Sequence, residues 1–193
     1  SSRMDSEEIA RITTQAVAIA KASALAKTRD VNLGPQVVTT GSYQTQIKLD
    51  PFLVSMNDKI KLLLRADEEM RRVRGVKVAQ GEMAFVRENK LFMSTEGSQI
   101  DQEIVESGCG IRALATNPES GEVQVRSYPN AGGRHQMTRG YEFIQESRLP
   151  ENAQRIGEEA VALLSADPCP SYDAMTILLD GSHRIGGGAA DLP

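Results

Sequence analysis

The chain has few side chains that could hold a metal ion or build a disulfide framework. It contains two cysteines, Cys109 and Cys169, and two histidines, His135 and His183, among 193 residues. Disulfide scaffolds and C-x-x-C metal sites need more cysteines or closer spacing, so we interpret both as reduced thiols. Zinc needs three or four positioned ligands, and no such set stands at ligand spacing from either histidine. The residues by themselves predict no metal site in this chain.

The sequence also lacks an excess of positive charge. Its formal net charge is −4 and its pI is about 5.3. Most non-specific affinity for a phosphate backbone comes from a positive field, so direct binding of nucleic acid is not expected. The arginines between Arg65 and Arg74 are interleaved with acidic residues, which is typical of a solvated helix face.

Long apolar runs are missing as well. No stretch approaches the ~20 apolar residues that a membrane span needs, and no basic segment followed by an apolar run opens the chain. These features predict a cytoplasmic protein that does not interact with a membrane.

Two helices are predicted in the first part of the chain. Asp5 is a suitable N-cap for a helix over about residues 6–26, whose apolar residues recur at helical spacing. Ser55 can cap a second helix over about residues 56–74, and Gly75 stands where that helix should stop. The segment between the two helices is interrupted by glycine and proline, which favours an extended connection.

After Gly75 the apolar period changes from 3.6 to about 2, which indicates strands. Three turn signals separate the strand-like runs, at Glu88-Asn89-Lys90, at Glu96-Gly97-Ser98 and at residues 117–121. The strands are predicted at residues 76–87, 90–95, 99–116 and 121–128. The third is long enough to need a bend, for which Gly108 and Gly110 are suitable.

A short helix is expected within residues 138–148, and Pro150 fits the first turn of another helix. The apolar run of residues 174–179 then predicts a buried strand. The fold class predicted is α+β, an antiparallel meander sheet packed against helices.

Candidate functional residues are few. The chain has no G-x-S-x-G elbow, and Gly186-Gly187-Gly188 is not followed by the Lys-Ser or Lys-Thr of a phosphate loop. Arg134 and His135 stand on a glycine-rich loop, where they could grip a peptide carboxylate or carbonyl. They are the predicted substrate-binding residues, against the alternative that His135 is an ordinary surface histidine.

Four segments, in order, resemble the TldD/PmbA family, once described as modulators of DNA gyrase. They are the Ser/Thr-Glu-Gly feature in residues 91–103, the Gly-Arg-His-Gln loop leading to residues 139–142, the helix with residues 156–160, and residues 176–182. The resemblance covers roughly residues 6–182 and points to the TldD branch. It implies the fold of the family's N-terminal domain.

The resemblance also implies a zinc metallopeptidase for the intact family member, with an H-E-x-x-x-H motif soon after the Leu-Asp-Gly-Ser strand. Here Arg184 follows His183 where glutamate is expected, and Gly188 stands at the place of the second histidine. We therefore expect residues 1–168 to form the N-terminal α+β domain and residues 169–193 to begin a truncated or altered C-terminal domain. No catalytic or metal-binding residue carries over, and the chain alone is predicted to be inactive.

Two functions remain open from the sequence. In the first, the chain shapes substrate access and assembly in a cytosolic zinc peptidase that acts on peptides or unfolded segments. In the second, it is a non-catalytic binding or assembly module that pairs with a catalytic homologue through an open sheet edge, or a regulator of DNA gyrase. The partners expected are a peptide substrate and either a second copy or a family paralogue. The apolar residues 174–179 are a further expected site of self-association.

Overall fold

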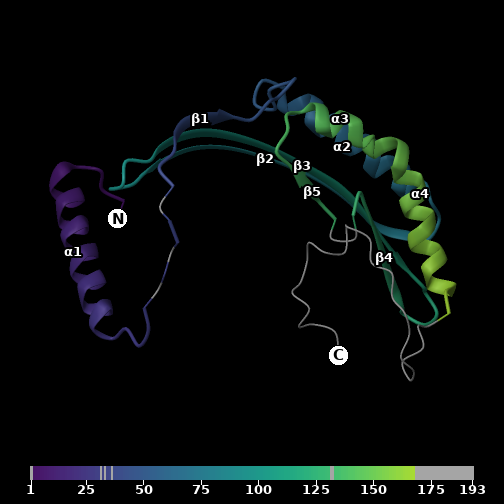
Figure 1. Cartoon of the computed structure of the whole chain (residues 1–193). Coiled ribbons are helices and arrows are strands. Elements are labelled where there is room, and N and C mark those ends of the chain that lie inside the picture. Colours follow the sequence, from purple (N-terminus) through teal and green to yellow (C-terminus); the bar gives the residue numbers. More distant parts are fainter. Residues whose placement is uncertain (1, 31, 33, 36, 131–132, 168–193) are drawn as a thin grey trace. The chain divides into compact units, whose positions relative to one another are not determined.

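The computed structural model describes residues 2–30, 32, 34–35, 37–130 and 133–167 (Figure 1). Contacts divide the chain into two compact units, Ser1–Val38 and Thr39–Pro193, which are described separately. The boundary predicted near residue 168 and the strand predicted at residues 174–179 lie at or outside the limits of the described residues.

The described residues of the first unit contain one helix, α1, Ser6–Leu25. The predicted N-cap is confirmed, because the Asp5 carboxylate accepts a hydrogen bond from the backbone N–H of Glu8 at 2.9 Å. Glu8 in turn forms an ion pair with Arg11 at 2.6 Å. The apolar residues Ile9 and Ile19 are more than half exposed within this unit.

In the part of the second unit that the structure describes, the elements are built around one mixed sheet of five strands. Strand β3, Gln99–Thr116, lies at its centre, and β2, Val76–Met93, pairs with it in antiparallel fashion along its whole length. Three short strands share the other side of β3. They are β1, Thr40–Gln44, β5, His135–Met137, and β4, Val123–Tyr128.

The predicted α+β class is confirmed, and β2, β3 and β4 form the expected antiparallel meander. The sheet is nevertheless mixed, because β1 pairs with β3 in parallel orientation. This strand lies in the segment that the sequence predicted to be only an extended connection. Its five residues include no aliphatic residue and are all exposed, so no alternation of apolar and polar residues signals it.

The turn predicted at Glu88-Asn89-Lys90 is wrong. These residues continue β2, with Asn89 opposite Glu103 and Lys90 opposite Gln102. The chain reverses only at residues 94–98, where the backbone N–H of Gly97 donates to the carbonyl of Ser94 at 3.1 Å. The long partner strand β3 continues to pair with β2 there, and this pairing outweighs the local turn preference of Asn89.

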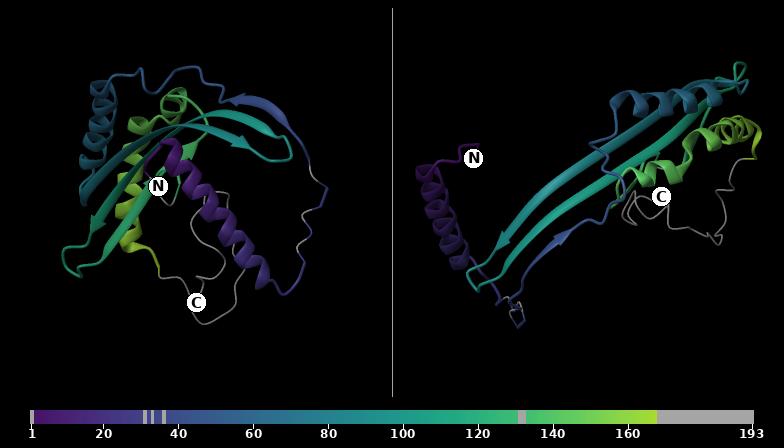
Figure 2. Two further views of the ribbon diagram at one scale, coloured as in Figure 1. Left: turned by 90° about the vertical axis from the view of Figure 1, so that its left-hand side faces the viewer. Right: turned by 90° about the horizontal axis from the view of Figure 1, so that it is seen from above.

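The helices of this unit cover one face of the sheet (Figures 1 and 2). They are α2, Met56–Arg71, α3, Glu142–Ser147, and α4, Leu149–Ala162, followed by the short 3-10 turn η1, Leu163–Ser165. Ser55 caps α2 as predicted, its hydroxyl accepting from the N–H of Asp58 at 3.1 Å. Helix α2 packs against β2, in agreement with the predicted packing of helices on the sheet.

The core lies between these helices and the sheet. Its largest fully buried side chains include Met70, Ile111, Ile144, Leu149 and Ile156. Odd-numbered residues of β3 from Val105 to Ala115 are buried beneath the helices, whereas Glu106, Arg112 and Leu114 alternate with them on the opposite face. In the described part of the chain, no helix is long and apolar enough to cross a bilayer.

Glu142 ties the connection between β1 and α2 to the start of α3. Its carboxylate accepts hydrogen bonds from the backbone N–H groups of Leu49 at 3.1 Å and Gly140 at 3.0 Å. Desolvation raises the pKa of this buried carboxyl, but the backbone hydrogen bonds together outweigh it and hold the pKa below its ordinary value.

This carboxyl should make stability depend on pH. Because its pKa is lower in the folded state, its contribution is complete above the unfolded-state pKa of about 4.3 and is lost as pH falls through the folded-state pKa. Glu142→Gln should therefore unfold with a weaker dependence on pH below about pH 5 than the wild type. Denaturant titrations across this range measure it, and parallel pH profiles for the two proteins would contradict the assignment.

Candidate functional site

The two predicted substrate-binding residues lie on opposite faces of the sheet. His135 begins β5 opposite Cys109, and its ring meets Phe143 of α3 edge-on, with centroids 5.5 Å apart. Arg134 crosses the other face above Gly108, and its Nη1 lies 3.7 Å from Oε2 of Glu82. The structure therefore does not bring the two side chains to one site. Their role in substrate binding stays a prediction.

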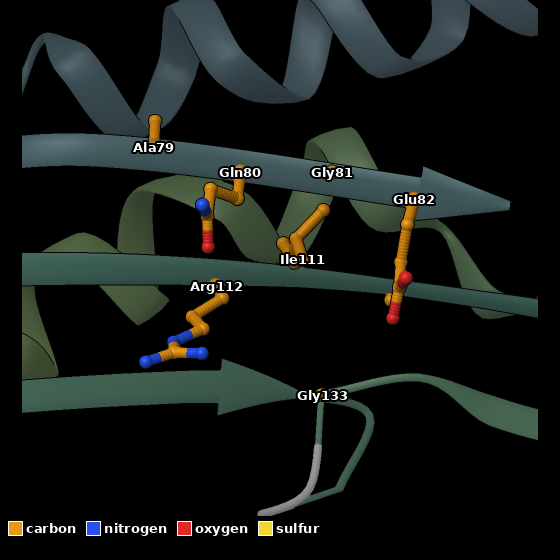
Figure 3. Close-up of a pocket in the computed structure, with 8 residues that line it drawn as sticks. Ala79, Gln80, Gly81, Glu82, Ile111, Arg112 and Gly133 are labelled. Carbon is orange, nitrogen blue, oxygen red and sulfur yellow. The ribbon is translucent and has the colours of Figure 1, made fainter.

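A hollow of about 530 Å³ lies on the face of the sheet that the helices leave open. Figure 3 shows Gln80, Glu82 and Arg112 projecting from β2 and β3, with the helices behind the strands. Register explains why these residues meet, since Gln80 is opposite Arg112 and Glu82 is opposite Gly110. Residues directly opposite each other in an antiparallel pair point to the same face.

Glycine at position 110 lets the chain after β4 cross this face closely. A Cβ atom there would lie 2.3 Å from the carbonyl oxygen of Gly133. Gly81 sits on the other face, where a Cβ would meet Leu63 of α2 at 3.0 Å. Because residue 110 has no side chain, Gly133 can lie close to β3 and line the hollow. The lining therefore includes backbone as well as side chains.

The lining offers both hydrogen-bond donors and acceptors. Arg112 supplies a guanidinium that is exposed and forms no ion pair with another described residue. Gln80 can donate and accept, and Glu82 accepts. The Glu82–Arg134 pair is long and partly exposed, so it is weak and both groups can turn to a ligand. Such a surface suits the alternating N–H and C=O groups of a peptide.

The described residues do not fit a zinc site. They contain no group of three or more His, Cys, Asp or Glu side chains placed to hold a metal ion. Cys109 is a free thiol in the core, where burial raises its pKa despite a contact with Ser147 and so favours the neutral form. Cys169 and His183 lie outside the described residues.

Sequence reasoning missed Gln80, Glu82 and Arg112. A signal for them exists, because the turn at residues 94–98 fixes the register that places residue 80 opposite residue 112. The turn predicted at residues 88–90 divided the predicted β2 into two strands. The predicted strands therefore did not show that residue 80 lies opposite residue 112.

Comparison with models of known protein families gave a match. The model of the PmbA/TldA metallopeptidase central domain matches residues 49–166. No curated protein matched the chain. The matched range contains α2, α3, α4 and the strands β2 to β5, and therefore every residue that lines the hollow. The matching model is that of the family's central domain, whereas the sequence resemblance had indicated the N-terminal portion of the family more broadly. Since the match covers more than half of the chain, this protein belongs to the TldD/PmbA metallopeptidase family.

Proposed function

We propose that this domain holds an extended peptide on the open face of its sheet, as the substrate-access part of a cytoplasmic, zinc-dependent peptidase. The observation that carries the proposal is the hollow over β2 and β3, with Gln80 and Glu82 projecting from β2 and Arg112 from β3. Its volume of about 530 Å³ is in the range of small-ligand sites, so it accommodates a short part of a peptide rather than a folded domain.

The chemistry of the lining supports a peptide ligand. Every peptide unit presents one donor and one acceptor whatever its side chain. A guanidinium, an amide and a carboxylate within one hollow can satisfy both kinds of group and hold unfolded segments of varied sequence. Zinc would supply the polarised water for hydrolysis. The described residues would bind and orient the peptide, and no hydrolytic step is assigned to them.

A second candidate is a non-catalytic assembly module that partners a family paralogue. The observation that favours it is the outer edge of β2, which has no hydrogen-bonded strand among the described residues. Regulation of DNA gyrase through direct DNA contact gains no support, because many arginines of the described part, such as Arg71, Arg126 and Arg139, form ion pairs with carboxylates.

Arg112→Ala should weaken peptide binding about tenfold, because it removes a charge-assisted hydrogen bond from the hollow. Fluorescence anisotropy with a labelled, unstructured peptide measures the dissociation constant. Arg65→Ala is the matched control, since Arg65 is an exposed arginine on α2, on the helix-covered side. Equal affinities for the two variants, with the Arg112 variant folded by circular dichroism, would remove the hollow from the binding site.

A further inference from the structure

Three apolar side chains form a row across the open face of the sheet, next to Arg112. Val78 of β2 lies opposite Leu114 of β3, and Leu114 lies opposite Val125 of β4. Opposed residues of an antiparallel pair point to the same face, so all three share the open face with Arg112. Val78 and Val125 are 39% and 37% exposed, and Leu114 is partly buried. We call these three side chains the apolar row.

The apolar row and the guanidinium lie one step apart along the strands. Leu114 follows Arg112 by two positions, and alternate residues of a strand are about 6.6 Å apart. Neighbouring strands are about 4.8 Å apart, so a row across three strands spans about 10 Å. The surface therefore offers a cation and an apolar contact area at a spacing that one amino-acid residue with a free carboxylate can bridge.

The charge of Arg112 favours an anion. Other arginines of the sheet are engaged, since Arg87 pairs with Asp50 and Arg126 pairs with Glu159. Arg112 is exposed and forms no ion pair with another described residue. A guanidinium binds a carboxylate through two parallel hydrogen bonds, which are stronger than bonds to a neutral peptide carbonyl.

The same hollow selects against a more highly charged anion. Glu82 lines it together with Arg112, and its carboxylate is more than half exposed. A phosphate group carries nearly two negative charges at neutral pH, which one guanidinium does not neutralise beside a carboxylate. A carboxylate with a single charge matches the one free guanidinium.

We propose that the hollow recognises the C-terminal residue of a peptide. Arg112 binds the free α-carboxylate, and the apolar row contacts the last side chain, which is apolar. This inference rests on the proposed peptide binding and names the part of the peptide that is bound.

The groups on the other side of Arg112 suit the rest of the peptide. Glu82 lies two positions beyond Gln80 on β2, opposite Gly110. Its carboxylate accepts from peptide N–H groups, and the Gln80 amide both donates and accepts. Gly133 lines this part of the hollow, and a Cβ added to it would meet nothing within 4 Å, so open space adjoins it. The chain that precedes the C-terminal residue can therefore leave the hollow on the side away from the apolar row.

Two peptides that differ only at the C-terminus test the carboxylate. The probes are an unstructured peptide ending in leucine, labelled at its N-terminus, and the C-terminal amide of the same peptide. Fluorescence anisotropy with the full chain should give a dissociation constant about tenfold lower for the free acid, because only the acid forms the charge-assisted pair. Arg112→Ala should abolish this difference, and the control Arg65→Ala, on the helix-covered side, should keep it.

The outcomes separate this inference from the proposed peptide binding. Equal affinities for acid and amide, both weakened by Arg112→Ala, would leave the peptide site in place and overturn the recognition of the C-terminus. An amidated peptide whose last residue is aspartate tests whether any carboxylate suffices, and an affinity equal to that of the free acid would overturn it too. If neither leucine peptide binds, the proposed function fails as well.

Two substitutions that keep the shape of the side chain test the apolar row. Val78→Thr combined with Val125→Thr replaces one methyl group of each residue by a hydroxyl and retains the β-branched form that strands favour. The wild type should bind the free acid ending in leucine about fivefold more tightly than one ending in serine. The double variant should lose most of this preference and keep its preference for acid over amide.

Val86→Thr is the matched control for the double variant. Val86 is 45% exposed on the same face of β2 but does not line the hollow. Its replacement should leave the preference for leucine unchanged. A wild type that binds the two free acids equally, or a double variant that retains the full preference for leucine, would remove the apolar row from the site.

Discussion

Ile156→Ala is expected to lower the free energy of unfolding of the second unit by about 3–4 kcal/mol. Ile156 lies on α4 and is 1% exposed, within the core cluster that includes Met70, Ile111 and Ile144. The substitution loses the transfer free energy of the deleted carbons and leaves a cavity that helices and sheet together enclose. Urea or guanidinium denaturation followed by circular dichroism measures the change.

Ile19→Ala is the matched control for this substitution. Ile19 is also on a helix but is 58% exposed in the first unit. Its replacement should change stability by no more than about 0.5 kcal/mol. A loss below about 1 kcal/mol for Ile156→Ala would show that the packing between α4 and the sheet is loose, contrary to the structure.

Gly140→Ala is expected to lower the free energy of unfolding of the second unit by about 2–3 kcal/mol, because the added methyl group overpacks its site. A Cβ atom at this position would lie 2.4 Å from the carbonyl oxygen of Leu49 and 2.5 Å from Oε2 of Glu142. Leu49 cannot withdraw freely, because its carbonyl accepts a hydrogen bond from Tyr141 at 2.8 Å and its N–H donates to Glu142. The added methyl group must therefore break one of these bonds or shift the chain.

Gly41→Ala provides the comparison. Gly41 lies in β1, where an added Cβ would meet nothing within 4 Å. The alanine should leave stability unchanged or raise it by up to about 1 kcal/mol by restricting the unfolded chain. Thermal or chemical unfolding of both variants gives the contrast, and similar stabilities for the two would contradict the close approach of residues 49 and 140.

Local patterns in the sequence were enough to predict α2, α4, the caps at Asp5 and Ser55, and the α+β class of the fold. Each depends on neighbours within a few residues, such as a hydroxyl accepting from an N–H three positions along or apolar residues alternating on a strand. The ordered motifs likewise indicated the TldD/PmbA family, which the match over residues 49–166 confirmed.

Only the tertiary structure decided what pairs with what. Pairing with the long strand β3 makes residues 88–90 part of β2 instead of a turn. Strand β1 also forms by pairing with β3, although its sequence shows no apolar alternation. Register then joined Gln80 to Arg112 and separated Arg134 from His135, although the latter two are adjacent in sequence. Successive residues of extended chain point to opposite faces, whereas residues far apart meet when strands pair. The sequence by itself thus determined the main helices, the α+β class and the family, and strand pairing decided which side chains share a site.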